Sequence, residues 1–224
     1  MEGKWYNMKK SIESTIRKIN GSMALEGMSL TEEDKNRIRD IDEGKTTIEL
    51  EIGKLNKKYM KNDAMMDTIK KIKDEDKKKI IDFLRMEWGS TIMVLREGEV
   101  FDLKDEDGFV IYDKDNIIGL ITYRITNNRC EILSLDSKIE NKGIGTGLVE
   151  KVKEHAKNNQ CSLCRVVTTN DNLKAIGFFQ KRGFHLVNLY VKAMDTVRKI
   201  KPDVPKKGMD NIPLNDELEF EMNI

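Results

Sequence analysis

The sequence predicts an α+β (mixed α/β) protein with a small all-α domain at its N-terminus. Residues 1–60 carry only helical periodicity, whereas strand and helix patterns alternate from residue 68 to residue 224. Between them, residues 61–67 lose both periodicities. We therefore expect a three-helix domain over 1–60, a linker over 61–67 and a larger mixed domain over 68–224.

The composition narrows the class of protein. With 40 Lys and Arg residues against 39 Asp and Glu residues, the 224-residue chain is nearly neutral, which argues against a dedicated nucleic-acid binder. No apolar run approaches the roughly 18 residues that a membrane-spanning helix needs, so we expect neither export nor a membrane partner. A reducing cytoplasm fits best, because the cysteines are few and odd in number: Cys130, Cys161 and Cys164.

Three amphipathic helices account for the N-terminal domain. The first carries an apolar stripe from Ile12 to Met23 and is expected to reach about Glu26. Thr31 is the expected N-cap of the second helix, because three acidic residues follow it in the first turn. The third helix is expected to open with Thr46 and Glu49 as a capping box.

The mixed domain is expected to begin with a strand at 68–72 and a helix from Asp74 that turns Ile80, Ile81, Leu84 and Trp88 inward. The remaining elements, in order, are an apolar run at 91–95, strands at 109–112, 117–125 and 130–135, a helix through about 158, a strand at 163–168, a helix at 171–181, a strand from 184 and a strand at 217–224. Turn signals between the three strands of 109–135 make them an antiparallel meander.

A glycine-rich loop, Gly143 to Gly147, separates the meander from the helix that follows it. Glycines there let backbone N–H groups approach a ligand, and a helix N-terminus favours an anion, so the implied ligand is a phosphate. A tight turn without a ligand is the alternative. A Walker A loop is excluded because Leu148 follows Gly147, and a dinucleotide fold is disfavoured because an antiparallel meander precedes the loop.

A second motif follows about thirty residues later. It consists of Asn172, Ala175, Phe178, Phe179, Gly183 and Phe184. With the glycine loop it resembles the GNAT family of acetyl-CoA-dependent N-acetyltransferases, over about Thr68 to Ile224. The resemblance implies a twisted mixed β-sheet flanked by helices, an acetyl group passed directly from acetyl-CoA to an amine with CoA as product, and no metal.

The resemblance also implies where acetyl-CoA binds, namely between the splayed strands that end at Leu135 and Thr168. The residues expected to bind it are Leu133, Leu135, Asn141, Lys142, Gly143, Ile144, Gly145, Thr146, Gly147, Asn172, Phe178 and Phe179. Two positions depart from the family pattern. Glu140 stands where Arg or Gln is usual, and Phe179 replaces the Tyr that protonates the CoA thiolate. A non-catalytic acyl-CoA-binding module is therefore the alternative function.

Acetyl transfer needs a base for the ammonium and a donor for the carbonyl oxygen. The family implies a strand N–H as donor, which we place at Leu135. Glu131 is the expected base, because alternate residues of a strand face the same side of the sheet and Glu131 should therefore face the side of Leu133 and Leu135. The alternative is that Glu131 is an exposed strand residue without a catalytic role. Asp136 is the competing candidate for the base. His155 and His185 are expected to be packed or surface imidazoles.

Two further patterns bear on ligands and partners. Cys161 and Cys164 have metal spacing, but no second ligand pair accompanies them, so we expect a structural role and no metal. Ser22 and Glu26, four residues apart, lie in a segment that resembles VbhA-like antitoxins, whose glutamate pairs with an arginine of a Fic toxin. The expected partners are a small-molecule or protein amine acceptor, a Fic-type toxin through residues 1–60, and a second copy of the chain.

Overall fold

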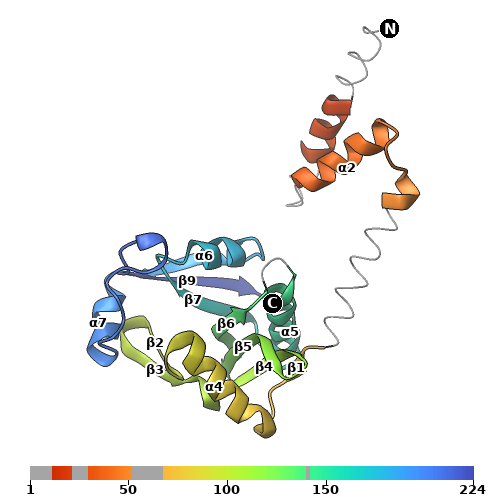
Figure 1. Ribbon diagram of the computed structural model, residues 1–224. Helices are drawn as coiled ribbons and strands as arrows, with labels where there is room; N and C mark the ends of the chain where they lie inside the picture. Colours follow the sequence, from red (N-terminus) through yellow and green to blue (C-terminus); the bar gives the residue numbers. More distant parts are fainter. Residues whose placement is uncertain (1–11, 22–29, 52–67, 140–141) are drawn as a thin grey trace. The chain divides into compact units, whose positions relative to one another are not determined.

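The computed structural model describes residues 12–21, 30–51, 68–139 and 142–224. The chain divides into two compact units, Met1–Lys61 and Asn62–Ile224, which are described separately (Figure 1). No helix among the described residues is long and apolar enough to cross a membrane.

The described residues of the N-terminal unit form three helical segments: residues 12–21, α2 (Glu32–Asp42) and residues 48–51. Thr31 is the N-cap of α2, as predicted, and exchanges hydrogen bonds with Asp34 in a capping box. The third helix differs from the prediction, because the Thr47 hydroxyl, and not that of Thr46, accepts the N–H of Leu50.

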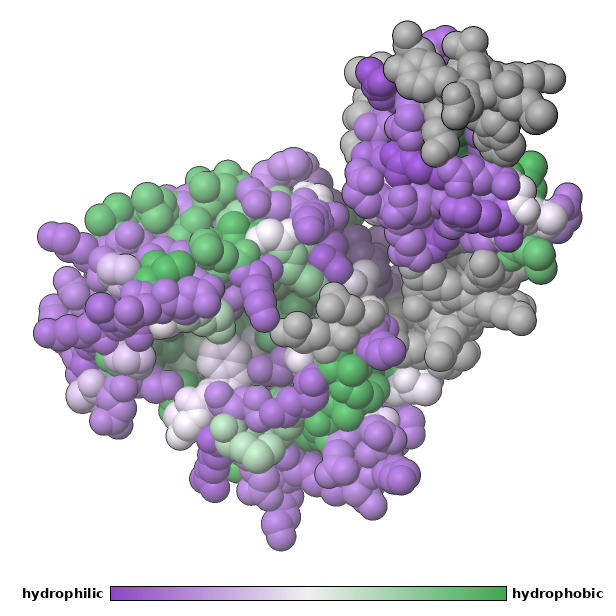
Figure 2. All heavy atoms as spheres, turned by 45° about the horizontal axis from the view of Figure 1, so that its top comes forward, coloured by the Kyte–Doolittle hydropathy of each residue, from purple (hydrophilic) through white to green (hydrophobic). Residues whose placement is uncertain are grey.

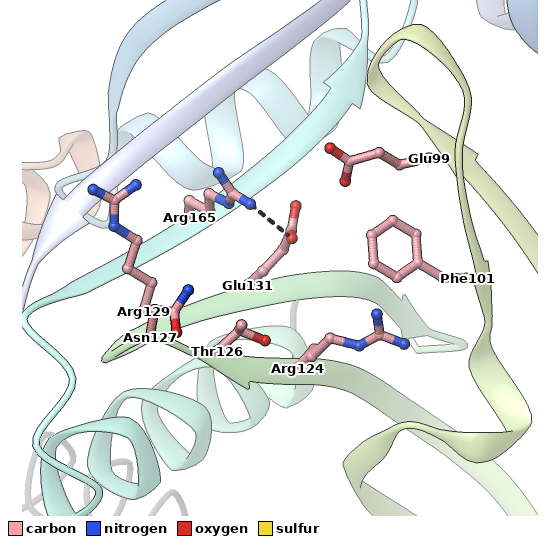
Figure 3. Close-up of a pocket in the computed structure, with 8 residues that line it drawn as sticks. All are labelled: Glu99, Phe101, Arg124, Thr126, Asn127, Arg129, Glu131 and Arg165. Atoms are coloured by element: carbon pink, nitrogen blue, oxygen red, sulfur yellow. Dashed lines mark hydrogen bonds and ion pairs between the residues drawn. The ribbon is translucent and has the colours of Figure 1, made fainter.

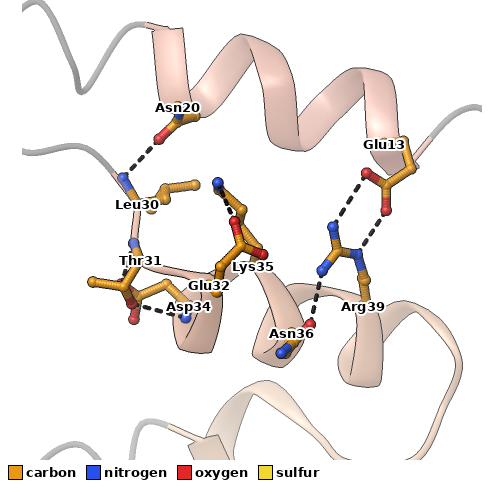
Figure 4. A network of polar contacts seen from close by, with 9 residues as sticks. All are labelled: Glu13, Asn20, Leu30, Thr31, Glu32, Asp34, Lys35, Asn36 and Arg39. Atoms are coloured by element: carbon orange, nitrogen blue, oxygen red, sulfur yellow. Dashed lines mark hydrogen bonds and ion pairs between the residues drawn. The ribbon is translucent and has the colours of Figure 1, made fainter.

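Polar contacts join the first two helices of this unit (Figure 4). Arg39 of α2 donates to both carboxylate oxygens of Glu13, at 2.6 and 3.3 Å. At the other end, the Leu30 N–H donates to the Asn20 side chain at 2.7 Å. Because Glu13 and Arg39 are substantially exposed, we expect these contacts to orient the helices more than to stabilise them.

The C-terminal unit is built on a β-sheet. Its strands are β1 (Lys70–Lys71), β4 (Asp107–Asp113), β5 (Asn116–Thr126), β6 (Arg129–Ser137), β7 (Leu163–Thr169), β9 (Glu217–Asn223) and β8 (His185–Tyr190), which lie in that order across the sheet. A separate hairpin pairs β2 (Ile92–Leu95) with β3 (Glu99–Asp102). The predicted antiparallel meander is confirmed as β4, β5 and β6.

Helices cover both faces of this sheet (Figure 1). They are α4 (Lys77–Trp88), α5 (Ile144–Asn158) and α6 (Leu173–Gln180). Helix α7 (Ala193–Ile200) packs instead against the β2–β3 hairpin. One core cluster joins α4 to Val110, Leu120 and Leu133, and the other joins α5 to Tyr123 and Ile132. The predicted fold class is therefore confirmed: a mixed sheet flanked by helices, with a small helical segment before it.

Three features of this unit differ from the sequence prediction, and the first is strand β3, which was not predicted. Trp88 is 42% exposed and not inward, and Phe83 fills the buried position on α4 instead. Helix α7, which buries Ala193, Met194 and Val197, was not predicted. Apolar residues also reach the surface of the unit between hydrophilic areas, as Figure 2 shows, and the edge strand β8 exposes Leu186 and Leu189.

Strands β6 and β7 separate partway along their length. They pair in parallel only from Arg129–Leu163 to Ile132–Val166, after which β7 continues beside β9. At the same point β6 gains one residue relative to β5, because Tyr123 faces Ile132 whereas Thr122 faces Ser134. A β-bulge at residue 133 therefore coincides with the start of the gap between the two strands.

Candidate functional site

The glycine loop leads directly into α5. Gly143 is the N-cap of this helix and has a φ of 80°, in the left-handed region that glycine adopts without strain. The first N–H groups of a helix have no partner within the helix, so those of α5 are available to an anion. Glu140 and Asn141, which the sequence places at the start of this loop, lie outside the described residues.

A cavity of about 510 Å³ opens where the loop, the end of β6 and helix α6 meet. Seven of the predicted binding residues line it: Leu135, Gly143, Gly145, Thr146, Asn172, Phe178 and Phe179. Four others do not: Leu133, Ile144 and Gly147 are buried, and Lys142 is exposed. The structure therefore brings the two sequence motifs together around one cavity.

Gly145 contributes to this cavity in a way that the sequence did not reveal. A Cβ atom on Gly145 would lie 3.3 Å from the Phe178 ring, tighter than ordinary van der Waals contact. The absence of a side chain thus allows α6 to pack closely against the start of α5. A larger residue there would displace an aromatic wall of the cavity.

Arg182 is a cavity residue that the sequence analysis missed. Its guanidinium lies 3.4 Å from the centroid of the Phe178 ring, donates to the Phe178 carbonyl at 2.7 Å and bonds the Thr146 hydroxyl. Its Nε is buried without a hydrogen-bond partner. Burial lowers the pKa of Arg182, but a guanidinium remains protonated. The sequence signal was a cation directly before Gly183 of the second motif.

Helix α6 positions the second motif. The Asn172 side chain is its N-cap and accepts the Ala175 N–H at 3.0 Å. Phe179 is only 3% exposed and meets Phe178 and Phe184 edge-on, with ring centroids 5.2 and 5.3 Å away. Asn172 thus has a structural role beside the cavity, and Phe179 forms an apolar wall.

Asp136 is the carboxylate that borders this cavity. The Trp88 indole N–H, from α4, lies 3.1 and 3.2 Å from its two oxygens. Burial raises the pKa of Asp136 to about 6, and the Trp88 hydrogen bond opposes this shift. A carboxylate with this pKa is largely ionised at neutral pH yet basic enough to accept a proton.

Glu131 does not share a face with Leu135, contrary to the parity prediction. The bulge at Leu133 shifts the alternation of side chains, so Leu135 packs on the α5 side whereas Leu133 packs on the α4 side. Glu131 is also 7% exposed, not an exposed strand residue. Both of its oxygens are held by arginines, Arg96 and Arg165.

Arg96 organises the groups around Glu131. It lies in the short 3-10 turn between β2 and β3, with a φ of 36° that is unusual for a residue with a side chain. Its side chain also pairs with Glu99, and its backbone N–H donates to Glu217 at 2.6 Å. Burial raises the pKa of Glu217 to about 7, although this hydrogen bond opposes the shift. These contacts fix the β2–β3 hairpin to β6 and β9.

The cysteines and one of the two histidines pack against other side chains. His155 meets the rings of Phe109 and Tyr123, whereas His185 is exposed on β8. The three cysteines are buried and unbridged, each packed in the cluster beneath α5. Within the part of the chain that the structure describes, no group of three His, Cys, Asp or Glu residues could hold a metal ion. Ser22 and Glu26 lie outside the described residues.

A mixed sheet with two diverging parallel strands and a glycine loop at a helix N-terminus are features of a GNAT-type acetyltransferase. The profile of the family described as Acetyltransferase (GNAT) family matches residues 77–184. Two proteins of Bacillus subtilis (strain 168), the uncharacterized proteins YxbD and YdhI, are 45% and 42% identical over 137 and 142 residues. These matches cover 61% and 63% of this chain and 86% and 88% of the relatives. The chain therefore belongs to the GNAT acetyltransferase family.

Solved structures show the same fold at low sequence identity. The IAA acetyltransferase from Bacillus cereus ATCC 14579 has a TM-score of 0.55 at 19% identity, covering 70% of this chain and 98% of that one. A Bacillus subtilis acetyltransferase in complex with CoA has a TM-score of 0.50 at 14% identity, covering 70% and 97%. At these identities the similarity supports the fold alone.

Proposed function

We propose that the C-terminal unit transfers an acetyl group from acetyl-CoA directly to an amine. The observation that carries this proposal is the cavity where the start of α5, the gap beside β6 and the Arg182 guanidinium meet. A Bacillus subtilis acetyltransferase of the same fold was solved in complex with CoA, the product that this reaction would release.

The donor's pyrophosphate would be held by backbone N–H groups between Gly143 and Gly147, at the positive end of α5. The family usually has Arg or Gln at the first position of the glycine motif, where this chain has Glu140. Arg182 would supply a cation to the pyrophosphate in its place. The position of Arg182 on the cavity wall beside Thr146 supports this role, since a guanidinium binds phosphate through charge-assisted hydrogen bonds. The pantetheine arm would follow the backbone from Leu133 to Leu135 along the gap.

Asp136 is the base that we favour over Glu131. Acetyl-CoA supplies an activated thioester, and the ammonium must lose a proton before its nitrogen can form the new C–N bond as the C–S bond breaks. Asp136 borders the donor cavity with a pKa near neutrality, whereas Glu131 is held by two arginines. The N–H of Leu135 is our proposed donor to the carbonyl oxygen.

The thiolate has no side-chain acid beside it in this proposal. Phe179 lacks a hydroxyl, and the Tyr190 hydroxyl donates to Glu219 at 2.6 Å and does not line the cavity. A thiol has a pKa near 8.5, so the thiolate can leave as an anion and take its proton from water. Phe179 also favours the second candidate, a non-catalytic acyl-CoA-binding module.

One experiment separates these two functions. Acetyl-CoA is mixed with the full chain and a panel of primary amines, and CoA release is followed with a thiol reagent. Amine-dependent release identifies the enzyme. Acetyl-CoA binding without release by any amine identifies the binding module, and absence of binding contradicts both.

A separate proposal concerns the N-terminal domain: we infer that residues 1–60 inhibit a Fic-type toxin. The support is that these residues form a compact unit of their own and that their described segments are helical. Glu26 would pair with an arginine of the toxin. Co-expression of the full chain should then neutralise a cognate toxin, and Glu26→Gly should abolish neutralisation without changing acetyl-CoA binding.

A further inference from the structure

A second cavity, of about 470 Å³, lies on the face of the sheet that α4 covers. Figure 3 shows it between the β2–β3 hairpin, which contributes Phe101, and the strands that carry Arg129, Glu131 and Arg165. No residue lines both this cavity and the donor cavity. The proposed function assigns no ligand to it.

Cationic groups are in excess on the walls of this cavity. Three arginines and two glutamates line it, which gives a formal charge of +1: Arg124, Arg129, Arg165, Glu99 and Glu131. The glutamates are already paired, Glu131 with Arg96 and Arg165 and Glu99 with Arg96. Arg124 is paired with Glu106.

One guanidinium on the cavity wall remains for a ligand. Arg129 is exposed at the start of β6 and makes no ion pair with any residue that the structure describes. A guanidinium matches a carboxylate with two parallel hydrogen bonds, and the nearby Glu99 and Glu131 would oppose a dianion such as phosphate. The charge pattern therefore fits a single carboxylate.

The second cavity lies close to the start of the gap between β6 and β7, where we place acetyl-CoA. Glu131 and Arg165 face each other one pair before the β6–β7 pairing ends. Leu133, where the gap begins, lies four residue steps after Arg129, a distance of about 13 Å along a strand. The Arg129 side chain can cover about half of this distance, and a chain of several methylenes between carboxylate and amine can cover the rest along the Phe101 ring, whereas an α-amino acid is too short.

We propose that this cavity binds the carboxylate of the acetyl acceptor, so that the acceptor class is an ω-amino acid whose amine reaches the gap between β6 and β7. This inference rests on the proposed acetyl transfer. It makes Arg129 a specificity-determining residue that contacts the acceptor and not the donor.

The test compares 6-aminohexanoate with hexylamine, which has the same chain and no carboxylate. The kcat/KM of the full chain for 6-aminohexanoate should exceed that for hexylamine by roughly tenfold or more, as expected for a charge-assisted hydrogen bond. In Arg129→Gln this ratio should fall toward one. Arg85→Gln, which removes an exposed arginine of α4, should leave the ratio unchanged. Equal kcat/KM values for the two amines, or a ratio that survives Arg129→Gln, would overturn the proposal.

Calorimetry separates a failure of this inference from a failure of acetyl transfer. Binding of 6-aminohexanoate to the full chain is measured without acetyl-CoA, and acetyl-CoA binding is measured separately. Binding of 6-aminohexanoate that Arg129→Gln weakens supports the carboxylate site even if no amine is acetylated. No binding at millimolar 6-aminohexanoate contradicts the site, whether or not acetyl-CoA binds.

Discussion

Replacing Arg96 by methionine tests the buried ion-pair network beneath the β2–β3 hairpin. The side chains of Arg96 and Glu131 are only 7% and 9% exposed, and removing one partner of a buried pair typically costs about 3–5 kcal/mol. Glu131 would keep Arg165 at 3.1 Å, so we expect the lower end, about 3 kcal/mol. The backbone N–H of residue 96 can still donate to Glu217, because the substitution does not alter the main chain.

A double-mutant cycle isolates the contribution of the pair. Free energies of unfolding are measured in urea for Arg96→Met, for Glu131→Met and for the double variant. The double variant should lose less than the two single losses together, by about 1–3 kcal/mol, because it leaves no unpaired charge between them. Arg85→Met, on the exposed side of α4, should change stability by less than about 0.5 kcal/mol. Additive losses in the cycle would refute the reasoning.

Three further predictions concern catalysis, donor binding and pH dependence. Asp136→Asn should lower kcat/KM roughly 100-fold or more without weakening acetyl-CoA binding. It should also abolish the rise in rate as the pH passes about 6, and an unchanged pH profile would exclude Asp136 as the base. Arg182→Gln should weaken CoA binding roughly tenfold, whereas its exposed neighbour in Lys181→Gln should not; equal affinities by calorimetry would remove Arg182 from the site. Burial raises the pKa of Glu217 from 4.5 to about 7, so the unfolding free energy should fall by about 3 kcal/mol as the pH rises through this range. Urea titrations of Glu217→Gln should not show this decrease in the unfolding free energy. A decrease that persists in the variant would contradict the assignment to Glu217.

Local sequence signals predicted the elements of the fold well. The Thr31 cap of α2 and the glycine loop before α5 were predicted because their determinants lie within a few residues of one another. The antiparallel meander followed from alternating apolar residues and short polar turns. These features depend little on the rest of the chain.

The side-chain arrangement of the site could not be predicted in the same way. The bulge at Leu133 depends on the register between β5 and β6, and one extra residue was enough to put Glu131 and Leu135 on opposite faces. Arg182 enters the donor cavity because α6 packs on the start of α5. The contacts of Arg96 join a turn, β6 and β9, which are far apart in the sequence.

Calorimetric titration of the full chain with acetyl-CoA is the most direct test of the proposed function. We predict saturable binding at one site per chain, accompanied by a rise in melting temperature that follows the measured affinity. Arg182→Gln should weaken both signals, because it removes a cation that lines the donor cavity. No heat of binding and no change in melting temperature at millimolar acetyl-CoA would contradict the proposal that this cavity holds the acetyl donor.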